Sequence, residues 1–240
     1  MTRRTVHALV LAGSLALASP ALAQQALTAQ DRADIQALTA GYATSLGACQ
    51  AEAYAELFAP ETGYFASNIR GEVIGRDKLI ALVRSERHCT NPAPAGRGGG
   101  AGQARPAPMV SITVTAAGVM GRADLGTARY DDEYVKTPAG WRFNSRTVMT
   151  QPEIEAGLTA GDTRAIRRLA GSDLGLFDDT YTTDANGAKR FRTAGVELGL
   201  SAEGVTGRAA LRNAPGHYED VYVRAAGGGW RFKSRTYVED

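Results

Sequence analysis

Alternating hydrophobic and polar residues recur in two closely similar stretches of the chain, Tyr130–Thr147 and Tyr218–Thr236. Each stretch contains two runs rich in Tyr, Val, Trp and Phe on either side of a glycine-containing turn, which is the pattern of a β-hairpin. If Lys136 pairs with Trp141 across the first turn, alternate side chains fall on opposite faces of the hairpin. We therefore expect an aromatic, buried face and a charged, solvated face in both hairpins.

The charged face of each hairpin is expected to carry cross-strand ion pairs. Asp131 lies opposite Arg146 in this arrangement, and Glu219 lies opposite Arg235 in the second hairpin. Exposed pairs stabilise little, so Arg146 is predicted to contribute at most about 1 kcal/mol to folding. The aromatic face of the first hairpin is predicted to consist of Tyr130, Asp132, Tyr134, Trp141, Phe143, Ser145 and Thr147.

Helical spacing of apolar residues predicts three helices before the first hairpin. Thr28 and Asp31 form a capping-box signal for the first helix, which is expected to end at Leu46. The other helices are expected at 50–58 and 77–87, and further helical turns at 153–158 and 162–169. Strands besides the hairpins are expected at 63–67, 72–74, 110–115, 119–125, 176–182, 191–200 and 205–212.

The repetition extends beyond the hairpins. Residues 110–123 match residues 196–209 without a gap, and the same offset places the helix at 161–169 over the helix at 75–83 by a weaker match. The unit is too long for a solenoid of two repeats. We therefore interpret the second half of the chain as a partial copy of the first, made of a helix followed by antiparallel strands.

Four features of the first half occur in the order typical of a known family: the helix after Thr28, the segment 53–60, the stretch 71–77 and the aromatic hairpin. Residues 24–150 resemble a SnoaL-like domain of the nuclear-transport-factor-2-like superfamily. The resemblance implies an α+β fold, in which a cone-like curved antiparallel sheet packs on three helices around an apolar pocket. The partial repeat, expected at 151–240, would pack on this first domain.

The superfamily includes ketosteroid isomerases, polyketide cyclases and scytalone dehydratase, which use Asp, His and Tyr side chains in the pocket. If this chain is a lyase or isomerase of that kind, its acid–base residues are expected to be Asp132, from its place on the aromatic face, with Tyr42 or Tyr64. Residues 47–50 and 109–110, where relatives keep an acid and a histidine, have neither. Binding of a small apolar molecule, or a role in assembly, is therefore the favoured function. The expected pocket residues are Phe58, Phe65, Met109, Tyr130, Tyr134, Trp141 and Phe143.

The sequence allows two interpretations of the role of Asp132. Its position between Tyr130 and Tyr134 on a buried face would desolvate the carboxyl group and raise its pKa toward a value useful for a general base. In the alternative, Ser145 and a tyrosine hydroxyl satisfy the carboxylate and its role is structural. The recurrence of the pattern at Asp220 favours the structural role.

The N-terminus has the pattern of a targeting segment. Arg3 and Arg4 precede an apolar run that ends in small residues before Gln24, so residues 1–23 are predicted to be a secretory signal peptide. The mature protein would then be periplasmic or secreted. The run is too short to span a membrane, and no cysteine near the cleavage zone could carry a lipid, so we expect no membrane anchor.

Charge and cysteine content limit the partners. Removal of residues 1–23 takes away two of the 27 basic residues and none of the 25 acidic ones, so the remaining chain has no net charge and gives no indication of nucleic-acid binding. The two cysteines, Cys49 and Cys89, are expected to form a disulfide rather than a metal site, and no cofactor is expected.

Residues 91–108 are expected to form a flexible loop. The aromatic face of the second copy must be buried on the first domain or on another chain, which leaves a homodimer open.

Overall fold

The computed structural model describes residues 27–91, 107–171, 193–212 and 215–240. The elements of the first half are α1 (Ala29–Gly47), α2 (Ala51–Ala55), β1 (Tyr64–Ser67), β2 (Gly71–Ile74), α3 (Arg76–Arg84), α4 (Arg87–Thr90), β3 (Ser111–Thr115), β4 (Gly118–Asp124), β5 (Ala128–Thr137) and β6 (Gly140–Thr150). Those of the second half are α5 (Gln151–Glu155), α6 (Ala160–Gly171), β7 (Thr193–Ser201), β8 (Gly204–Leu211), β9 (His217–Arg224) and β10 (Trp230–Val238). The predicted signal peptide, most of the predicted loop 91–108 and the predicted strand 176–182 lie outside the described residues.

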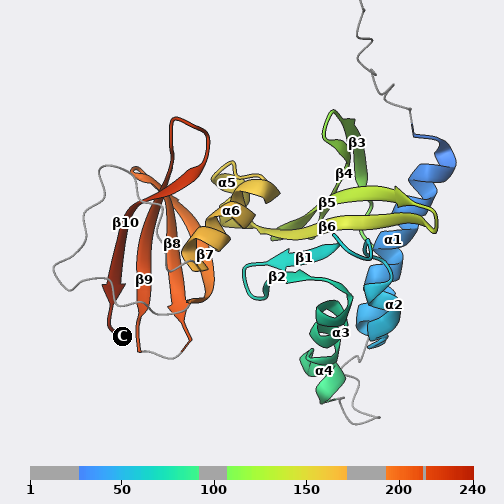
Figure 1. The fold of residues 1–240 in the computed structure, drawn as a ribbon, viewed down its shortest axis with the longest axis horizontal. Helices are drawn as coiled ribbons and strands as arrows, with labels where there is room; N and C mark the ends of the chain where they lie inside the picture. The colour runs from blue at the N-terminus through green and yellow to red at the C-terminus, as the bar shows by residue number, and fades with distance from the viewer. Residues whose placement is uncertain (1–26, 92–106, 172–192, 213–214) are drawn as a thin grey trace, which may run out of the picture.

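The first half contains a curved six-stranded sheet in the order β2-β1-β6-β5-β4-β3, which is antiparallel except for the parallel pair β1–β6 (Figure 1). Helices α1, α2 and α3 supply the other wall of its core. The α+β class and the curved sheet on helices are confirmed. The core is formed by Ile35, Leu38, Tyr42, Ala51, Tyr54, Ala55, Phe58, Phe65, Leu79, Ile80, Leu82, Val83, Tyr134, Trp141 and Phe143.

Helix α1 begins where the sequence predicts. The Thr28 hydroxyl accepts a hydrogen bond from the Asp31 amide at 3.0 Å, and the Asp31 carboxylate accepts one from the Thr28 amide at 3.1 Å. This reciprocal cap satisfies backbone donors that the helix itself leaves free. One stripe of the helix, which includes Ile35 and Leu38, is buried against the sheet.

Lys136 pairs with Trp141 as predicted, but a β-bulge changes the faces of the hairpin farther along. Tyr134 pairs with Phe143, whereas the preceding residue of β5 pairs with Ser145, so β6 has one extra residue between these two pairs. An extra residue reverses the alternation of the side chains beyond it. Arg146 therefore joins the aromatic face, where it is fully buried. The prediction that Arg146 lies on the solvated face is wrong.

The second half forms a separate four-stranded antiparallel sheet in the order β10-β9-β8-β7. Its strands do not extend the first sheet, and helices α5 and α6 lie between the two sheets (Figure 1). Residue Met149 of β6 packs with this second core. The other buried members of this core are Leu158, Ile166, Leu169, Ala170, Val196, Leu198, Val205, Ala209, Tyr218, Tyr222 and Phe232.

The contacts of α6 identify it as the copy of α1. Asp31, in the cap of α1, accepts a hydrogen bond from Trp141 Nε1 at 2.9 Å. Asp162, in the cap of α6, accepts the equivalent bond from Trp230 Nε1 at 3.0 Å. The alignment of α6 with α3 in the sequence is therefore wrong, although the match of the strands holds.

Charged side chains connect α6 to the first sheet. Glu72 of β2 pairs with Arg168 at 2.8 Å, and the Arg164 guanidinium donates a hydrogen bond to the Tyr64 hydroxyl. Glu153 of α5 is fully buried and pairs with Arg167 at 2.5 Å. The two halves thus meet through a polar seam as well as through Met149, which packs in the second core.

Candidate functional site

Arg146 lies at the centre of the first domain and has no exposed surface. Its Nε donates to Asp132 Oδ1 at 2.9 Å, and its Nη2 donates to Asp132 Oδ2 at 2.7 Å. Nη2 also donates to the Thr39 hydroxyl of α1 at 3.0 Å. This two-pronged pairing is a strong form of charge-assisted hydrogen bond. The remaining nitrogen, Nη1, has no hydrogen-bond partner among the described residues.

Three aromatic rings enclose the guanidinium. Its carbon Cζ lies 4.4 Å from the ring centre of Tyr42, 4.1 Å from that of Tyr130 and 4.2 Å from that of Phe143. The negative faces of such rings attract a cation, and the attraction is stronger where water is excluded. The rings therefore compensate part of the cost of burying the charge of Arg146.

The Asp132 carboxylate accepts three hydrogen bonds, one at Oδ1 and two at Oδ2. Besides the two bonds from Arg146, its Oδ2 accepts a hydrogen bond from the Tyr134 hydroxyl at 2.8 Å. Burial by itself lowers the pKa of Arg146, but the attraction and hydrogen bonds of Asp132 outweigh it and hold that pKa above its ordinary value. Burial, and then the Asp132 charge, raise the pKa of the Tyr134 hydroxyl. The ion pair and the neutral tyrosine form one stable group, and this geometry favours a structural role for Asp132 over that of a base.

The second copy repeats this group. Arg235 donates to both oxygens of Asp220, at 2.8 and 2.9 Å, and the Tyr222 hydroxyl donates to Oδ2 at 2.6 Å. Arg235 also donates to the backbone oxygen of Ala170 in α6, at 2.9 Å. A group that occurs in both copies is suited to fixing the helix on the sheet. The sequence indicated the repeated Asp and Tyr, but the bulge hid their arginine partner.

The two tyrosines predicted to act with Asp132 lie in different places. Tyr42 is buried beside Arg146, and burial raises the pKa of its hydroxyl well above the ordinary value. Tyr64 contacts Arg164 of α6, whose guanidinium lies 5.0 Å from the tyrosine ring centre. The structure thus brings Tyr42 and Asp132 together around one arginine and places Tyr64 in the seam between the halves.

The predicted pocket residues are mostly packed against one another. Five of them, Phe58, Phe65, Tyr134, Trp141 and Phe143, are members of the buried core, and Tyr130 packs against its edge. Met109 is 79% exposed and lies outside this core.

Phe58 also contributes to the wall of an open pocket of about 380 Å³. Its lining is mostly apolar and includes Phe58, Pro60 and Leu79. The charged lining residues are Arg76 of α3, Arg142 of the β5–β6 hairpin and Glu56. We refer to it as the Phe58 pocket. Of the residues predicted for the cone's apolar pocket, only Phe58 lines this one. The sequence did not indicate its two arginines, because the hairpin turn and α3 are distant in the chain.

Cys49 and Cys89 form the predicted disulfide, which joins the end of α1 to α4. His88 lies beside it, and the three potential ligand atoms are within 4.8 Å of one another. Because the two sulfur atoms are bonded to each other, they do not offer thiolates to a metal ion. None of the helices in the described part of the chain is long and apolar enough to cross a membrane.

The helices on a curved sheet define a domain of the nuclear-transport-factor-2-like type. Residues 27–147, half of the chain, match the family model of the SnoaL-like domain, and the chain belongs to that family. None of the curated proteins matches the chain.

Several solved structures are similar to about half of the chain at low identity. An NTF2-like protein with a cystatin-like fold from Novosphingobium aromaticivorans is 23% identical over 50% of this chain and 82% of its own, with a TM-score of 0.37. A protein of unknown function from Nostoc punctiforme is 20% identical over 52% and 95% of the chains, with a TM-score of 0.38. A ketosteroid isomerase-like protein from Erwinia carotovora atroseptica is 14% identical over 51% and 98%, with a TM-score of 0.34.

Proposed function

We propose that the Phe58 pocket binds a small, largely apolar molecule that carries an acidic group. The protein would bind this molecule without catalysing an acid–base reaction on it. The observation that carries the proposal is a mostly apolar lining that contains two arginines and one acidic residue, Glu56, which already lies 3.8 Å from Arg76. Its volume of about 380 Å³ is in the range of small-molecule sites. An apolar body would contact Phe58 and Leu79, and an acidic group would meet the guanidinium groups.

Arg142 is the arginine better placed to pair with such a ligand. Its Nη1 donates to the Trp141 backbone oxygen at 2.7 Å, and it has no ion pair with an acidic side chain of the described residues. Arg76, in contrast, has Glu56 at 3.8 Å. A guanidinium without a carboxylate beside an apolar lining suits an anionic headgroup.

The lyase or isomerase alternative requires a carboxylate that can accept a proton from a substrate. Asp132 accepts three hydrogen bonds, two of them from a buried arginine. This arrangement supports the binding proposal over the catalytic one. The pattern of residues 1–23 and the Cys49–Cys89 disulfide support an exported protein, and a homodimer stays a prediction.

The binding proposal is tested with two probes of the same ring system, 2-naphthoate and the uncharged 2-naphthalenemethanol, by titration calorimetry. Wild-type protein should bind 2-naphthoate more tightly. Arg142→Gln should weaken that binding by about tenfold, the loss of one charge-assisted hydrogen bond, and leave the alcohol unchanged. Ala139→Trp, at the exposed hairpin turn that lines the pocket, should abolish binding of both probes.

The second copy supplies a matched control. Arg231 donates to the Trp230 backbone oxygen at 2.8 Å, as Arg142 does to Trp141, but it does not line the Phe58 pocket. Arg231→Gln should therefore bind both probes like the wild type. Binding that survives Ala139→Trp, or no binding of either probe at millimolar concentration, would overturn the proposal.

A further inference from the structure

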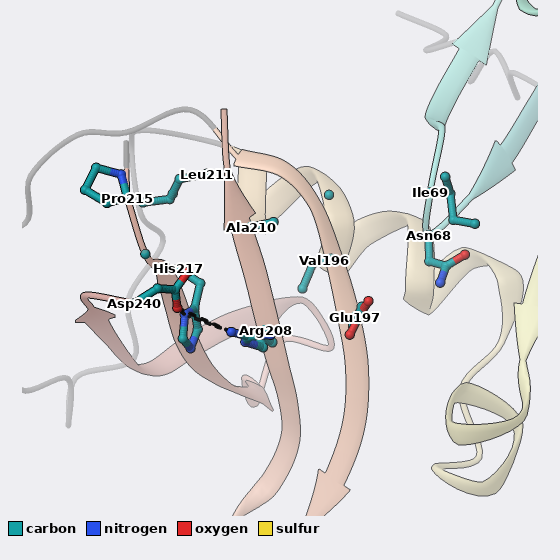
Figure 2. A pocket seen from close by; sticks show the side chains of 12 residues that line it. Asn68, Ile69, Val196, Glu197, Arg208, Ala210, Leu211, Pro215, His217 and Asp240 are labelled. Atoms are coloured by element: carbon teal, nitrogen blue, oxygen red, sulfur yellow. Dashed lines mark hydrogen bonds and ion pairs between the residues drawn. The ribbon is translucent and has the colours of Figure 1, made fainter. Parts of the chain in front are cut away.

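A second pocket, of about 530 Å³, lies where the two halves of the chain meet. Figure 2 shows its walls: Asn68 and Ile69 come from the β1–β2 turn, and the remaining side chains come from the second sheet, from Pro215 just before β9 and from the end of the described chain. Ligand sites occur preferentially at junctions of this kind, and the volume is that of a small-molecule site. We refer to it as the junction pocket. It is separate from the Phe58 pocket, with which it shares no residue.

Close backbone contact holds the two walls of the junction pocket together. A Cβ atom added at Gly195 of β7 would lie 2.8 Å from the backbone oxygen of Asn68, so the β1–β2 turn rests directly on β7. The ion pair of Glu72 with Arg168 fixes the same hairpin to α6. The pocket is therefore a built feature of the junction, although its walls are distant in the sequence.

The charged groups on one wall neutralise one another. Asp240 Oδ1 lies 2.7 Å from His217 Nδ1 and 3.4 Å from Arg208 Nη2, and that nitrogen lies 3.2 Å from His217 Nδ1 (Figure 2). Glu219, at 3.7 Å from His217 Nε2, adds a second carboxylate outside the pocket lining. An incoming anion would meet Asp240 and would have to displace these contacts.

Glu197 is a charged residue of the pocket lining. It faces Arg208 across the β7–β8 ladder, but it forms no hydrogen bond or ion pair within the described ranges of the chain. In Figure 2 it stands apart from the cluster around His217. Two apolar side chains, Ile69, which is 77% exposed, and Leu211, line the same pocket farther from Glu197.

We propose that the junction pocket binds a small organic cation, with its ammonium group paired with Glu197 and its apolar body against Ile69 and Leu211. A neutral apolar ligand would remove water from the Glu197 carboxylate without replacing its hydrogen bonds, which is costly. An anion would add to the negative charge of Glu197 and Asp240. An ammonium ion supplies the missing partner, and the apolar wall holds the rest of the molecule.

Monodansylcadaverine, which joins an apolar fluorescent ring to a primary ammonium group, tests this proposal on the full chain. Dansylamide, which has the ring but no ammonium group, is the matched probe. The wild-type protein should bind monodansylcadaverine at least tenfold more tightly than dansylamide, measured by fluorescence titration. Glu197→Gln should remove this difference, and because Glu197 is exposed the variant should keep its fold, which circular dichroism checks.

Glu203→Gln controls for the general loss of one negative charge. Glu203 lies at the turn after β7, outside the pocket lining, so its variant should keep the wild-type preference for monodansylcadaverine. Ile69→Ser should weaken both dansyl probes, since it removes the exposed apolar wall. Equal affinity of the wild type for the two probes, or an equal effect of Glu197→Gln and Glu203→Gln, would overturn the proposal.

Discussion

Arg146 and Asp132 form an ion pair in which neither side chain has exposed surface, with Nη2 and Oδ2 2.7 Å apart. A buried pair of this kind stabilises modestly as a pair, but removal of one partner leaves an uncompensated charge inside the protein. The pair joins β5 to β6, and its third contact, at Thr39, joins both strands to α1. It is therefore a buried polar contact that fixes the sheet to the first helix, in addition to the bond between Trp141 and Asp31.

Arg146→Met should lower the free energy of unfolding of the first domain by about 3–5 kcal/mol, because Asp132 loses its buried counter-charge. The chain has two tryptophans, Trp141 in the first domain and Trp230 in the second half. Urea unfolding followed by Trp141 fluorescence in a Trp230→Phe background reports on the first domain alone. A cost below about 1 kcal/mol would mean that Arg146 is solvated, as an exposed pair would be.

The double variant Arg146→Met with Asp132→Asn is the control for this prediction. It removes both charges, so it should recover a large part of the lost stability. Arg235→Met makes the matched change in the second copy, where it should shift the Trp230 transition and leave the Trp141 transition in place.

Asp31 should make the first domain sensitive to acid. The hydrogen bond from Lys136, and then those from Thr28 and Trp141, hold the pKa of Asp31 far below its ordinary value. Because the folded pKa is lower than the unfolded one, the stabilisation is complete above about pH 4 and is lost as the pH falls through the folded value. Asp31→Asn should therefore flatten the dependence of stability on pH in the acid range, read from Trp141 fluorescence.

Asp34→Asn is the matched control for the acid prediction. It removes the same charge from the same helix but does not contact Trp141. This variant should keep the steep acid dependence of the wild type. If both variants flatten the profile equally, the net charge of α1, rather than the contact to Trp141, is responsible.

Loss of the disulfide should destabilise the first domain. Cys49 and Cys89 are 40 residues apart, and the chain-entropy model assigns about 4 kcal/mol to closing a loop of this length. The double variant Cys49→Ala, Cys89→Ala should approach this loss in urea unfolding. Titration of the denatured, non-reduced wild type should find no free thiol, and two free thiols would contradict the bond.

Gly195→Ala should disturb the junction between the halves. Its Cβ would lie 2.8 Å from the Asn68 backbone oxygen, so β7 or the β1–β2 turn must move, at a cost of about 1–3 kcal/mol. Faster hydrogen exchange at the β1–β2 turn would show this movement. Gly227→Ala is the control, because a Cβ there meets no atom within 4 Å. Unchanged exchange in Gly195→Ala would contradict the contact.

The alternation of residues was sufficient to predict the hairpins but not their faces beyond the bulge. Tyr134 and Trp141 are where the pattern places them, whereas Arg146 is on the opposite face from the one predicted. A strict period of two contains no information on an inserted residue. The clue was the shared spacing in Phe143–Arg146 and Phe232–Arg235: in both copies two polar residues, the second of them a serine, separate the phenylalanine from the arginine.

The pockets were harder to predict than the core. The aromatic residues around Phe143 follow from hydrophobic spacing, because burial depends on the local pattern. Neither Arg142 in the Phe58 pocket nor Glu197 in the junction pocket has a distinctive sequence context. Each residue lines its pocket because segments that are distant in the chain pack together. A local sequence pattern does not predict such packing.

The two copies of the bond between a capping aspartate and a hairpin tryptophan close chain segments of different length. Asp31 and Trp141 are 110 residues apart, whereas Asp162 and Trp230 are 68 residues apart. The entropic cost of closing the shorter segment is therefore lower by about 0.4 kcal/mol. Proteins with shorter-range contacts also fold faster. When the full chain is diluted from urea, the C-terminal copy should therefore complete its contact first, and the N-terminal domain should fold alongside a neighbour that is already formed.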